Sequence, residues 1–296
     1  MDAKQRRKLV ERYRVEDGKG FRLKKHATDD TAGLNSSKQE IADLLREGVE
    51  RLSAIQDKLY AQDRWSVLCI FQAMDAGGKD GAIKHVFSGL NPQGCHVTSF
   101  KAPSTLELDH DFLWRHVVNL PARGMIGIHN RSWYEEVLIA RVHPEILGKQ
   151  KLPDEMRDRK RLMDERLEDI AAFERYLARQ GTVILKFFLH VGKDEQRRRF
   201  LARIEEPEKN WKFNAGDVAE RRHWDAYQDA YETAIRATAA PHAPWHVIPA
   251  DNKPFARLAV SVALSEALEG LDLRYPEVSE AERAALEEAR RELAEE

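Results

Sequence analysis

The chain has 296 residues, 42% of them hydrophobic and 33% charged, with a formal net charge of −2; this suits one sizeable domain and excludes the strong basic field that attracts nucleic acid. No apolar run approaches the roughly 18 residues of a membrane-spanning helix, and the basic N-terminus leads into no signal-type apolar region, so we expect neither a membrane partner nor secretion. Because Cys69 and Cys95 lie in strand-like runs typical of buried, reduced thiols, we expect a cytoplasmic protein.

The chain begins with a polar segment, residues 1–36, that shows no regular pattern. A capping box at 37–40 then opens a long amphipathic helix over 37–62, because apolar residues recur behind it at helical spacing. From Trp65 onward, short apolar runs alternate with helical patterns. The predicted strands are 66–72, 95–100, 124–129, 182–190 and 245–249, and the predicted helices are 80–88, 106–117, 133–141, 154–179, 194–205, 217–238 and 253–269.

This alternation predicts an α/β fold, with a five-stranded parallel sheet covered by helices on both faces. Residues 1–64 form an N-terminal extension whose long helix packs on the core, and 65–275 form the core domain with a lid at about 194–216. Residues 276–296 form a polar C-terminal helix that opens with another capping box. In such sheets ligands gather at the carboxyl ends of the strands.

The segment 73–81, Ala-Met-Asp-Ala-Gly-Gly-Lys-Asp-Gly, joins the first predicted core strand to a helix. Strand, glycine-rich turn, lysine and helix in this order are typical of a phosphate-binding P-loop of the Walker A kind. Gly77, Gly78 and Gly81 let backbone N–H groups approach phosphate oxygens, and Lys79 adds a mobile positive charge. The alternative is a glycine-rich turn that binds no ligand.

The loop departs from the common Walker A pattern at its metal-binding position. Asp80 stands where a Ser or Thr hydroxyl normally ligates Mg²⁺. Either Asp80 ligates the metal as a carboxylate, or Asp75 inside the loop does. Many phosphate-loop enzymes end the third strand in an Asp that holds Mg²⁺, but Asn130 stands here, which shifts the metal role further onto Asp75.

Several further residues are candidates for phosphate binding. Arg131 presents a fork that suits phosphate, and Glu135 is expected to face the acceptor. Lys84 and Lys101 extend a cationic track suited to a long polyanion, or are ordinary surface lysines. No general base stands out, which favours a phosphate as the acceptor, because a terminal phosphate is already largely ionised at neutral pH.

The segment 194–216 has the composition of a mobile lid. Arg199 and Arg203 lie at i, i+4 on one helix face and would repel each other unless an anion or acidic side chains offset their charges. The functional interpretation is that these arginines close over phosphates, with Lys209 and Lys212 beside them. The alternative is that the glutamates at 205–208 neutralise them.

These pieces together make the chain resemble the polyphosphate kinase 2 family. The resemblance spans roughly residues 12–270, so its ordered motifs are very specific. The matching motifs are Asp75–Gly81 with Lys84, Asn91–Pro92, Phe100–Pro103, His110–Arg115, Gly127–Glu135, Lys186–His190, Pro207–Phe213, Trp224–Tyr227, Ala243–Trp245 and Pro249–Asp251.

The resemblance implies a thymidylate-kinase-like P-loop core with a helical lid, and reversible phosphoryl transfer between polyphosphate and nucleotides with Mg²⁺, or alternatively Mn²⁺. It places catalytic roles on Asp75, Lys79 and Arg131, and the lid arginine on Arg199 rather than Arg203. The Asn130 and Glu135 pairing resembles the class III subgroup, which implies conversion of AMP to ADP and of ADP to ATP. The implied partners are adenine nucleotides, with guanine nucleotides as an alternative, and further copies of the chain in a homo-oligomer (dimer or tetramer).

Two rival functions remain open on the sequence. The first is an ATP-dependent nucleoside monophosphate kinase on the same core, which would use ATP and ignore polyphosphate. The second is a non-catalytic module that binds a polyanion or a nucleotide. Its signature would be loss of Asp75 or Lys79, and both residues are present.

Overall fold

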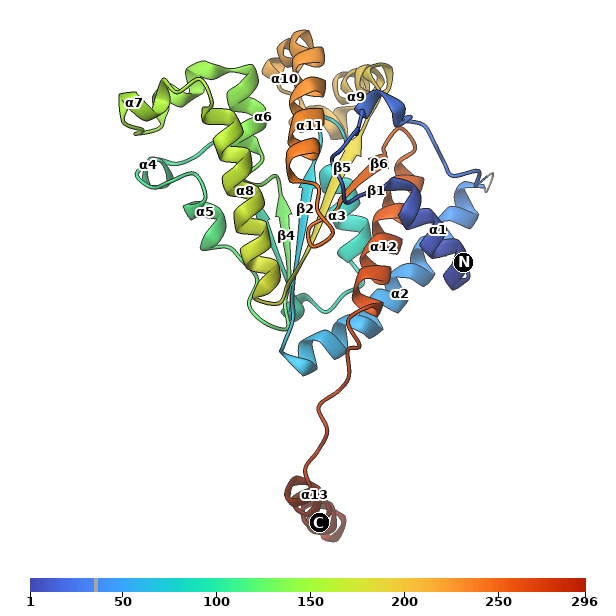
Figure 1. Cartoon of the computed structure of the whole chain (residues 1–296). Coiled ribbons are helices and arrows are strands. Elements are labelled where there is room, and N and C mark those ends of the chain that lie inside the picture. Colours follow the sequence, from blue (N-terminus) through green and yellow to red (C-terminus); the bar gives the residue numbers. More distant parts are fainter. Residues whose placement is uncertain (35–36) are drawn as a thin grey trace.

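A computed structural model describes residues 1–34 and 37–296 and places one six-stranded sheet at the centre of the molecule (Figure 1). The strand order is β1-β6-β5-β2-β4-β3, and all neighbours are parallel except β1 and β6. The predicted α/β fold with a parallel sheet is therefore confirmed, with one extra edge strand. The strands are β1 (Arg14–Val15), β2 (Ser66–Gln72), β3 (Cys95–Ser99), β4 (Ile126–Asn130), β5 (Thr182–His190) and β6 (Trp245–Pro249).

The central strands are buried on both faces, as expected for a parallel sheet covered by helices. Every residue of β2 is buried, and β2 pairs along its whole length with β5. Phe71 of β2 stacks on Phe187 of β5 with ring centroids 5.0 Å apart. The carboxyl ends of β2, β4, β5 and β6 thereby meet at one edge, which is where the phosphate-binding loop begins.

The helices form two layers, one on each face of the sheet (Figure 1). One layer contains α6, α8 and α11, and the other contains α1 (Ala3–Tyr13), α2 (Lys38–Gln62), α3 and α12. The helices following α2 are α3 (Lys79–Phe87), α4 (Thr105–Leu108), α5 (Trp114–Val117), α6 (Glu135–Val142), α7 (Asp154–Arg157), α8 (Leu162–Arg179), α9 (Lys193–Glu205), α10 (Ala215–Glu220), α11 (Trp224–Thr238), α12 (Lys253–Glu269) and α13 (Glu280–Glu295).

Three predicted helices are interrupted in the structure. The helix predicted over 106–117 is broken into α4 and α5, because the Asp111 side chain accepts a hydrogen bond from the Leu113 amide at 2.9 Å and holds a turn between them. The helices predicted over 154–179 and 217–238 are likewise split, into α7 with α8 and into α10 with α11. Amphipathic spacing continues across these breaks, so it does not reveal them.

The prediction that residues 1–36 are irregular is wrong for residues 3–15 and 23–25, which form regular elements, and it holds for most of 16–34, while residues 35 and 36 lie outside the described residues. Helix α1 (Ala3–Tyr13) begins at a capping box on Asp2 and packs against α12. Arg6 pairs with Glu266 at 2.7 Å and with Glu269 at 3.1 Å, so α1 is held by partners more than 250 residues away. The predicted long helix is present as α2 (Lys38–Gln62), with its capping box at Ser37, and it also packs on α12.

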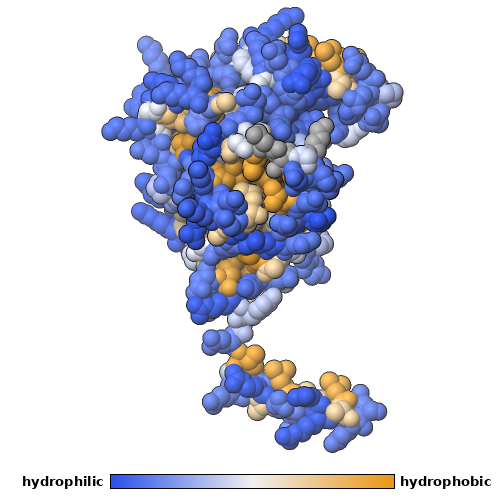
Figure 2. All heavy atoms as spheres, turned by 90° about the vertical axis from the view of Figure 1, so that its right-hand side faces the viewer, coloured by the Kyte–Doolittle hydropathy of each residue, from blue (hydrophilic) through white to orange (hydrophobic). Residues whose placement is uncertain are grey.

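The C-terminal helix α13 stands apart from the rest of the molecule (Figure 1). Its predicted capping box at Ser279 is present, and all its residues are exposed. Figure 2 shows apolar residues gathered along one side of this helix, among which Leu286 and Leu293 are exposed. In the part of the chain that the structure describes, no helix combines the length and the apolar character needed to span a membrane.

Four buried histidines predict that the protein loses stability in mild acid. Burial lowers the pKa of His116 to about 2, of His246 to about 3, and of His129 and His190 to about 4. The unfolded chain, with histidine pKa values near 6.5, therefore binds more protons, so the free energy of unfolding must fall as pH drops below about 6.5. Each histidine contributes up to about 1.4 kcal/mol per pH unit.

Urea unfolding at pH 7, 6 and 5 measures this dependence. The control is His116→Leu, because neither ring nitrogen of His116 has a hydrogen-bond partner among the described residues. Its free energy of unfolding should depend on pH less steeply, by about one histidine's share of roughly 1.4 kcal/mol per pH unit. A free energy of unfolding that is the same at pH 7 and pH 5 would contradict the prediction.

Candidate active site

The loop between β2 and α3 has the backbone of a tight phosphate-binding turn. Gly78, which precedes α3, has a left-handed φ of +103°, and Ala76 is also left-handed at +58°. A Cβ atom on Gly77 would lie only 2.6 Å from the Ala73 Cβ and 2.8 Å from the Met74 carbonyl oxygen. Glycine is therefore required at 77 by space and at 78 by conformation.

Lys79 lies at the first position of α3 and folds back across this loop. Its ammonium group donates a hydrogen bond to the Ala73 carbonyl at 3.0 Å. Burial lowers the pKa of Lys79, and nearby Arg131 lowers it further, while Asp75 and Glu135 oppose this shift. A bound phosphate would raise this pKa again, because a nearby anion stabilises the charged form of the lysine.

Asp75 and Arg131 face each other across the site, with a carboxylate to guanidinium distance of 3.4 Å. Arg131 follows the last residue of β4 and has a left-handed φ of +68°, held by its amide donating to the Phe71 carbonyl at 3.0 Å. A non-glycine residue in this region is strained, and such strain clusters at functional sites. The turn aims Arg131 at the loop of the neighbouring strand.

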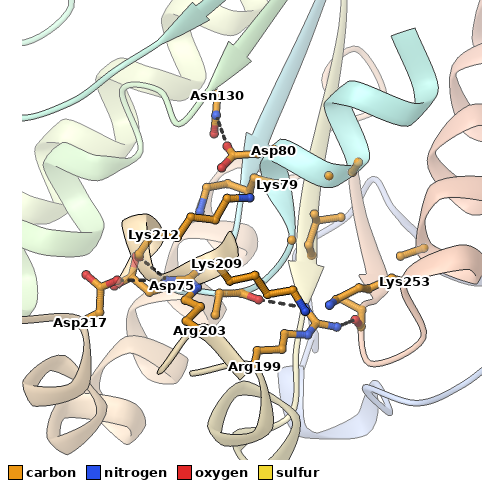
Figure 3. Close-up of a pocket in the computed structure, with 18 of the residues that line it drawn as sticks. Asp75, Lys79, Asp80, Asn130, Arg199, Arg203, Lys209, Lys212, Asp217 and Lys253 are labelled. Atoms are coloured by element: carbon orange, nitrogen blue, oxygen red, sulfur yellow. Dashed lines mark hydrogen bonds and ion pairs between the residues drawn. The ribbon is translucent and has the colours of Figure 1, made fainter. Parts of the chain in front are cut away.

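Two further predicted residues, Asn130 and Glu135, are fixed by hydrogen bonds beside the loop. The Asn130 amide donates to Asp80 at 2.7 Å (Figure 3). The fully buried Gln72 donates to the Glu135 carboxylate at 2.9 Å. Glu135 does not line the cavity, but it is the charged neighbour that most raises the pKa of Arg131. It therefore lies close to the cations of the loop.

The two lid arginines occupy different environments on α9. Arg199 is buried, and its guanidinium pairs with Glu195 at 2.7 Å. It also donates to the carbonyls of Ala76, at 2.9 Å, and Ala250. Arg203 is less confined; it pairs with Asp217 of α10 at 3.3 Å. Arg199 thus links the lid helix to the phosphate-binding loop, and its catalytic role stays a prediction.

The remaining predicted lysines are divided between the cavity and the surface. Lys101, Lys209 and Lys212 line the cavity, where Lys209 pairs with Glu206 and Lys212 lies 4.9 Å from the Trp211 ring centroid. Lys84 is exposed on α3 and is not among the residues that line the cavity. The track that the sequence suggests through Lys84 is therefore absent from the cavity wall as the structure describes it.

The structure adds five charged residues to the cavity wall that the sequence analysis did not assign to the site: Glu195, Arg198, Asp217, Lys253 and Arg257. Asp217 pairs with Arg203, and Lys253 and Arg257 lie in the first turns of α12. A usable signal existed for the last two, because the segment from Asn252 opens a helix directly after β6, and the carboxyl end of β6 lies at the same edge as the loop. Asp217 had no such signal.

Together these residues surround one cavity of about 880 Å³ at the carboxyl edge of the sheet (Figure 3). Ten basic and five acidic side chains line it, so it carries a surplus of five positive charges in a chain whose net charge is −2. Such a field attracts anions. The basic residues are Lys79, Lys101, Arg131, Arg198, Arg199, Arg203, Lys209, Lys212, Lys253 and Arg257.

The donor set beside the loop suits Mg²⁺ in its usual mode. No group of three or more His, Cys, Asp or Glu residues that could hold a metal occurs in the described parts of the chain. Asp75 and Asp80 nevertheless flank Lys79 and both line the cavity. Mg²⁺ is commonly held by one or two carboxylates together with substrate phosphates and water, so these two carboxylates fit such an ion.

A matched pair of glycine variants tests the geometry of the loop. Gly77→Ala should reduce activity roughly 100-fold, because its Cβ would displace the loop, and positioning errors of about 1 Å are this costly. Gly148→Ala is the control and should act as wild type, since a Cβ there would meet no atom within 4 Å and Gly148 is not among the residues that line the cavity. Steady-state rates check both variants, and equal activity of Gly77→Ala and wild type would contradict the assignment.

The sequence is similar to those of known proteins along most of its length. Residues 35–276 match the family model described as Polyphosphate kinase 2. The chain is 52% identical over 284 residues to the ADP-polyphosphate phosphotransferase of Rhodopseudomonas palustris, covering 96% of this chain and 98% of that protein. It is 46% identical over 268 residues to the AMP/ADP-polyphosphate phosphotransferase of Meiothermus ruber, covering 90% and 96%.

A solved structure agrees with these sequence comparisons. The crystal structure of polyphosphate kinase 2 from Arthrobacter aurescens superposes with a TM-score of 0.85 at 41% identity, covering 95% of this chain and 96% of that one. The match extends over nearly all of both chains. The chain belongs to the polyphosphate kinase 2 family.

Proposed function

We propose that this enzyme transfers phosphoryl groups from inorganic polyphosphate to AMP and ADP, reversibly and with Mg²⁺. The observation that carries the proposal is the surplus of five positive charges around a P-loop cavity, which suits a substrate richer in phosphate than one nucleotide. The names of two relatives support it, since the Rhodopseudomonas protein is called an ADP-polyphosphate and the Meiothermus protein an AMP/ADP-polyphosphate phosphotransferase.

The residues of the loop divide the work of binding and charge neutralisation. Lys79 and the backbone N–H groups at the start of α3 hold the transferring phosphoryl group, and Arg131 approaches it from the end of β4. Because the acceptor is an ionised phosphate, no side chain has to remove a proton. Catalysis then rests on alignment of the two phosphates and on stabilisation of the charge that develops between them.

Asp75, with Asp80 beside it, would hold Mg²⁺ against the substrate phosphates. The ion would supply charge neutralisation between donor and acceptor. In its absence Asp75 is compensated by Arg131 at 3.4 Å. Mn²⁺, which favours the same oxygen ligands, is an expected substitute.

The residues on the acceptor side of the site are the basis for proposing that the enzyme uses both AMP and ADP. Asn130 brings no charge to the position beside the loop, while Glu135 brings a carboxylate that buried Gln72 holds in place. The Meiothermus relative, whose name includes both nucleotides, matches 90% of this chain. We therefore propose that ADP formed from AMP serves as the next acceptor.

The test is to mix purified protein with polyphosphate, Mg²⁺ and AMP, without ATP, and to follow the nucleotides by chromatography. Appearance of ADP followed by ATP is the expected result. If ADP is the sole product, the enzyme accepts only monophosphates, and Glu135 does not have the role proposed for it in the use of both nucleotides. Activity that requires ATP as the donor would instead identify a nucleoside monophosphate kinase and overturn the proposal.

A further inference from the structure

Lys253 and Arg257 form a separate arm of the active-site cavity, on the side where α12 begins. They lie at i, i+4 on α12, so both face the same direction, and both line the cavity. Arg257 reaches towards α3, where its guanidinium lies 3.5 Å from the position that a Cβ of Gly81 would occupy. This arm is therefore continuous with the phosphate-binding loop.

The positive charge of this arm has no acidic partner among the residues that the structure describes. Neither Lys253 nor Arg257 has an ion pair or a side-chain hydrogen bond with any described residue. Glu195, the acid whose charge acts on Lys253, already pairs with Arg198 and Arg199 at 2.7 Å each. The neighbouring Asp251 is also engaged, by the Gly192 amide at 2.7 Å.

Several positively charged side chains lie close together in this arm. Figure 3 shows the Lys253 ammonium beside the Arg199 guanidinium, and Arg199 is the charged neighbour that most lowers the pKa of Lys253 and of Arg257, after burial. An arrangement of like charges is unfavourable unless an anion neutralises it. The arm is thus built for an anionic ligand.

The wall of the arm distinguishes a phosphate chain from a nucleoside. The cavity wall also contains Ala250, Ala256, the arginines of α9 and Lys209, and after burial and Arg199 the charge of Lys209 also lowers the pKa of Lys253. Among the described lining residues, the hydroxyl and amide side chains, Ser99 and Asn130, end β3 and β4, and the aromatic rings are Phe100, which follows β3, and the exposed Trp211, so α9 and α12 contribute none of these groups. Phosphate oxygens, in contrast, match ammonium and guanidinium groups directly.

We propose that Lys253 and Arg257 form a subsite that binds the polyphosphate chain beyond its reacting end. The inference rests on the proposed function and deepens it. The donor would pass from the loop towards α12, rather than along Lys84 on the exposed side of α3. The nucleotide would then occupy the opposite arm, near Lys101, Asn130 and Arg131.

The test compares the double variant Lys253→Gln/Arg257→Gln with wild type, using long-chain polyphosphate and tripolyphosphate as donors. The KM for long chains should rise tenfold or more, because each charge-assisted phosphate contact is typically worth roughly a factor of ten. The kcat, the KM for AMP and the KM for tripolyphosphate should change less than about twofold, because the double variant removes only contacts to the distant part of a long chain. Loss of such contacts raises the KM for long chains and leaves kcat unchanged. Lys84→Gln is the matched control and should behave as wild type.

The outcomes separate this inference from the proposed function. An unchanged KM for long chains in a wild-type-like background, or a rise in the KM for AMP instead, would overturn the subsite. If wild type does not use polyphosphate at all, the proposed function fails, and calorimetric titration with long-chain polyphosphate then decides the subsite: equal affinity of wild type and double variant rejects it. The variant Lys253→Arg/Arg257→Lys, which keeps both charges, should restore most of the affinity.

Discussion

Asp75→Asn is expected to lower the rate of phosphoryl transfer by roughly 10²–10³-fold, the usual effect of removing one charge-stabilising group from a transition state. The substitution keeps the size of the side chain and removes only its charge. It should not unfold the loop, because Gln196 holds this residue through its backbone carbonyl, at 2.9 Å, and not through the carboxylate. Initial rates with saturating Mg²⁺ and polyphosphate measure the effect.

The controls for Asp75→Asn separate catalysis from binding. Asp80→Asn, at an exposed position where the side chain already bonds Asn130, should cost less activity. Without Mg²⁺, Asp75→Asn should bind polyphosphate at least as tightly as wild type, because a negative charge has been removed from a cationic cavity. Turnover like that of wild type, or weaker metal-free binding, would show that Asp75 does not act through its charge at the reacting phosphates.

The phosphate-binding loop could be predicted from the sequence because its parts are adjacent in the chain. The apolar run of β2, the glycines and Lys79 follow one another, and each has a local conformational or charge requirement. Gly77 and Gly78 confirm this, since one is enforced by close packing and the other by its positive φ. Periodicity likewise gave five of the six strands, because parallel strands are continuous apolar runs.

The acidic partners of the two lid arginines could not be predicted from the local sequence. The i, i+4 spacing correctly puts Arg199 and Arg203 on one helix, and an offset of their charges by acids was one alternative. The acids involved, however, are Glu195 and Asp217, not the glutamates at 205–208. Which acid meets which arginine depends on how α9 and α10 pack, and spacing along one helix carries no information about that.

The other differences between the predictions and the structure arise from contacts between residues that are far apart in the sequence. Helix α1 looks too polar to be ordered until Glu266 and Glu269 of α12 are placed beside Arg6. Their position after β6 could have placed Lys253 and Arg257 at the edge of the sheet, but the approach of Arg257 to Gly81 depends on how α12 packs next to α3. Both cases require tertiary contacts between segments far apart in the sequence, which hydrophobic periodicity cannot supply.

A second large effect is expected at a buried ion pair beneath the site. Lys186 of β5 and Glu174 of α8 are 0% and 1% exposed and lie 2.5 Å apart. Glu174 also accepts hydrogen bonds from Tyr134, at 2.8 Å, and from Trp133, at 3.3 Å. These two aromatic residues precede Glu135 directly in the chain, so the pair anchors the segment that carries the acceptor-side residues.

Glu174→Leu should lower the free energy of unfolding by about 3–5 kcal/mol, because it leaves the Lys186 ammonium buried without a counter-charge. Burial lowers the pKa of Lys186, and Glu174 is the group that opposes this shift, so the lone ammonium would tend to lose its proton. Urea unfolding monitored by circular dichroism measures the loss.

The double variant Lys186→Met/Glu174→Leu is the decisive companion to this measurement. Replacing both charges by apolar groups of similar volume removes the buried ion and should recover most of the loss, since such exchanges are often neutral. Recovery should be incomplete by about 1–3 kcal/mol, because the Trp133 N–H loses its acceptor, whereas the Tyr134 hydroxyl keeps Thr238 at 2.9 Å. A double variant less stable than Glu174→Leu would mean that packing around these side chains, and not the unpaired charge, determines the stability of this region.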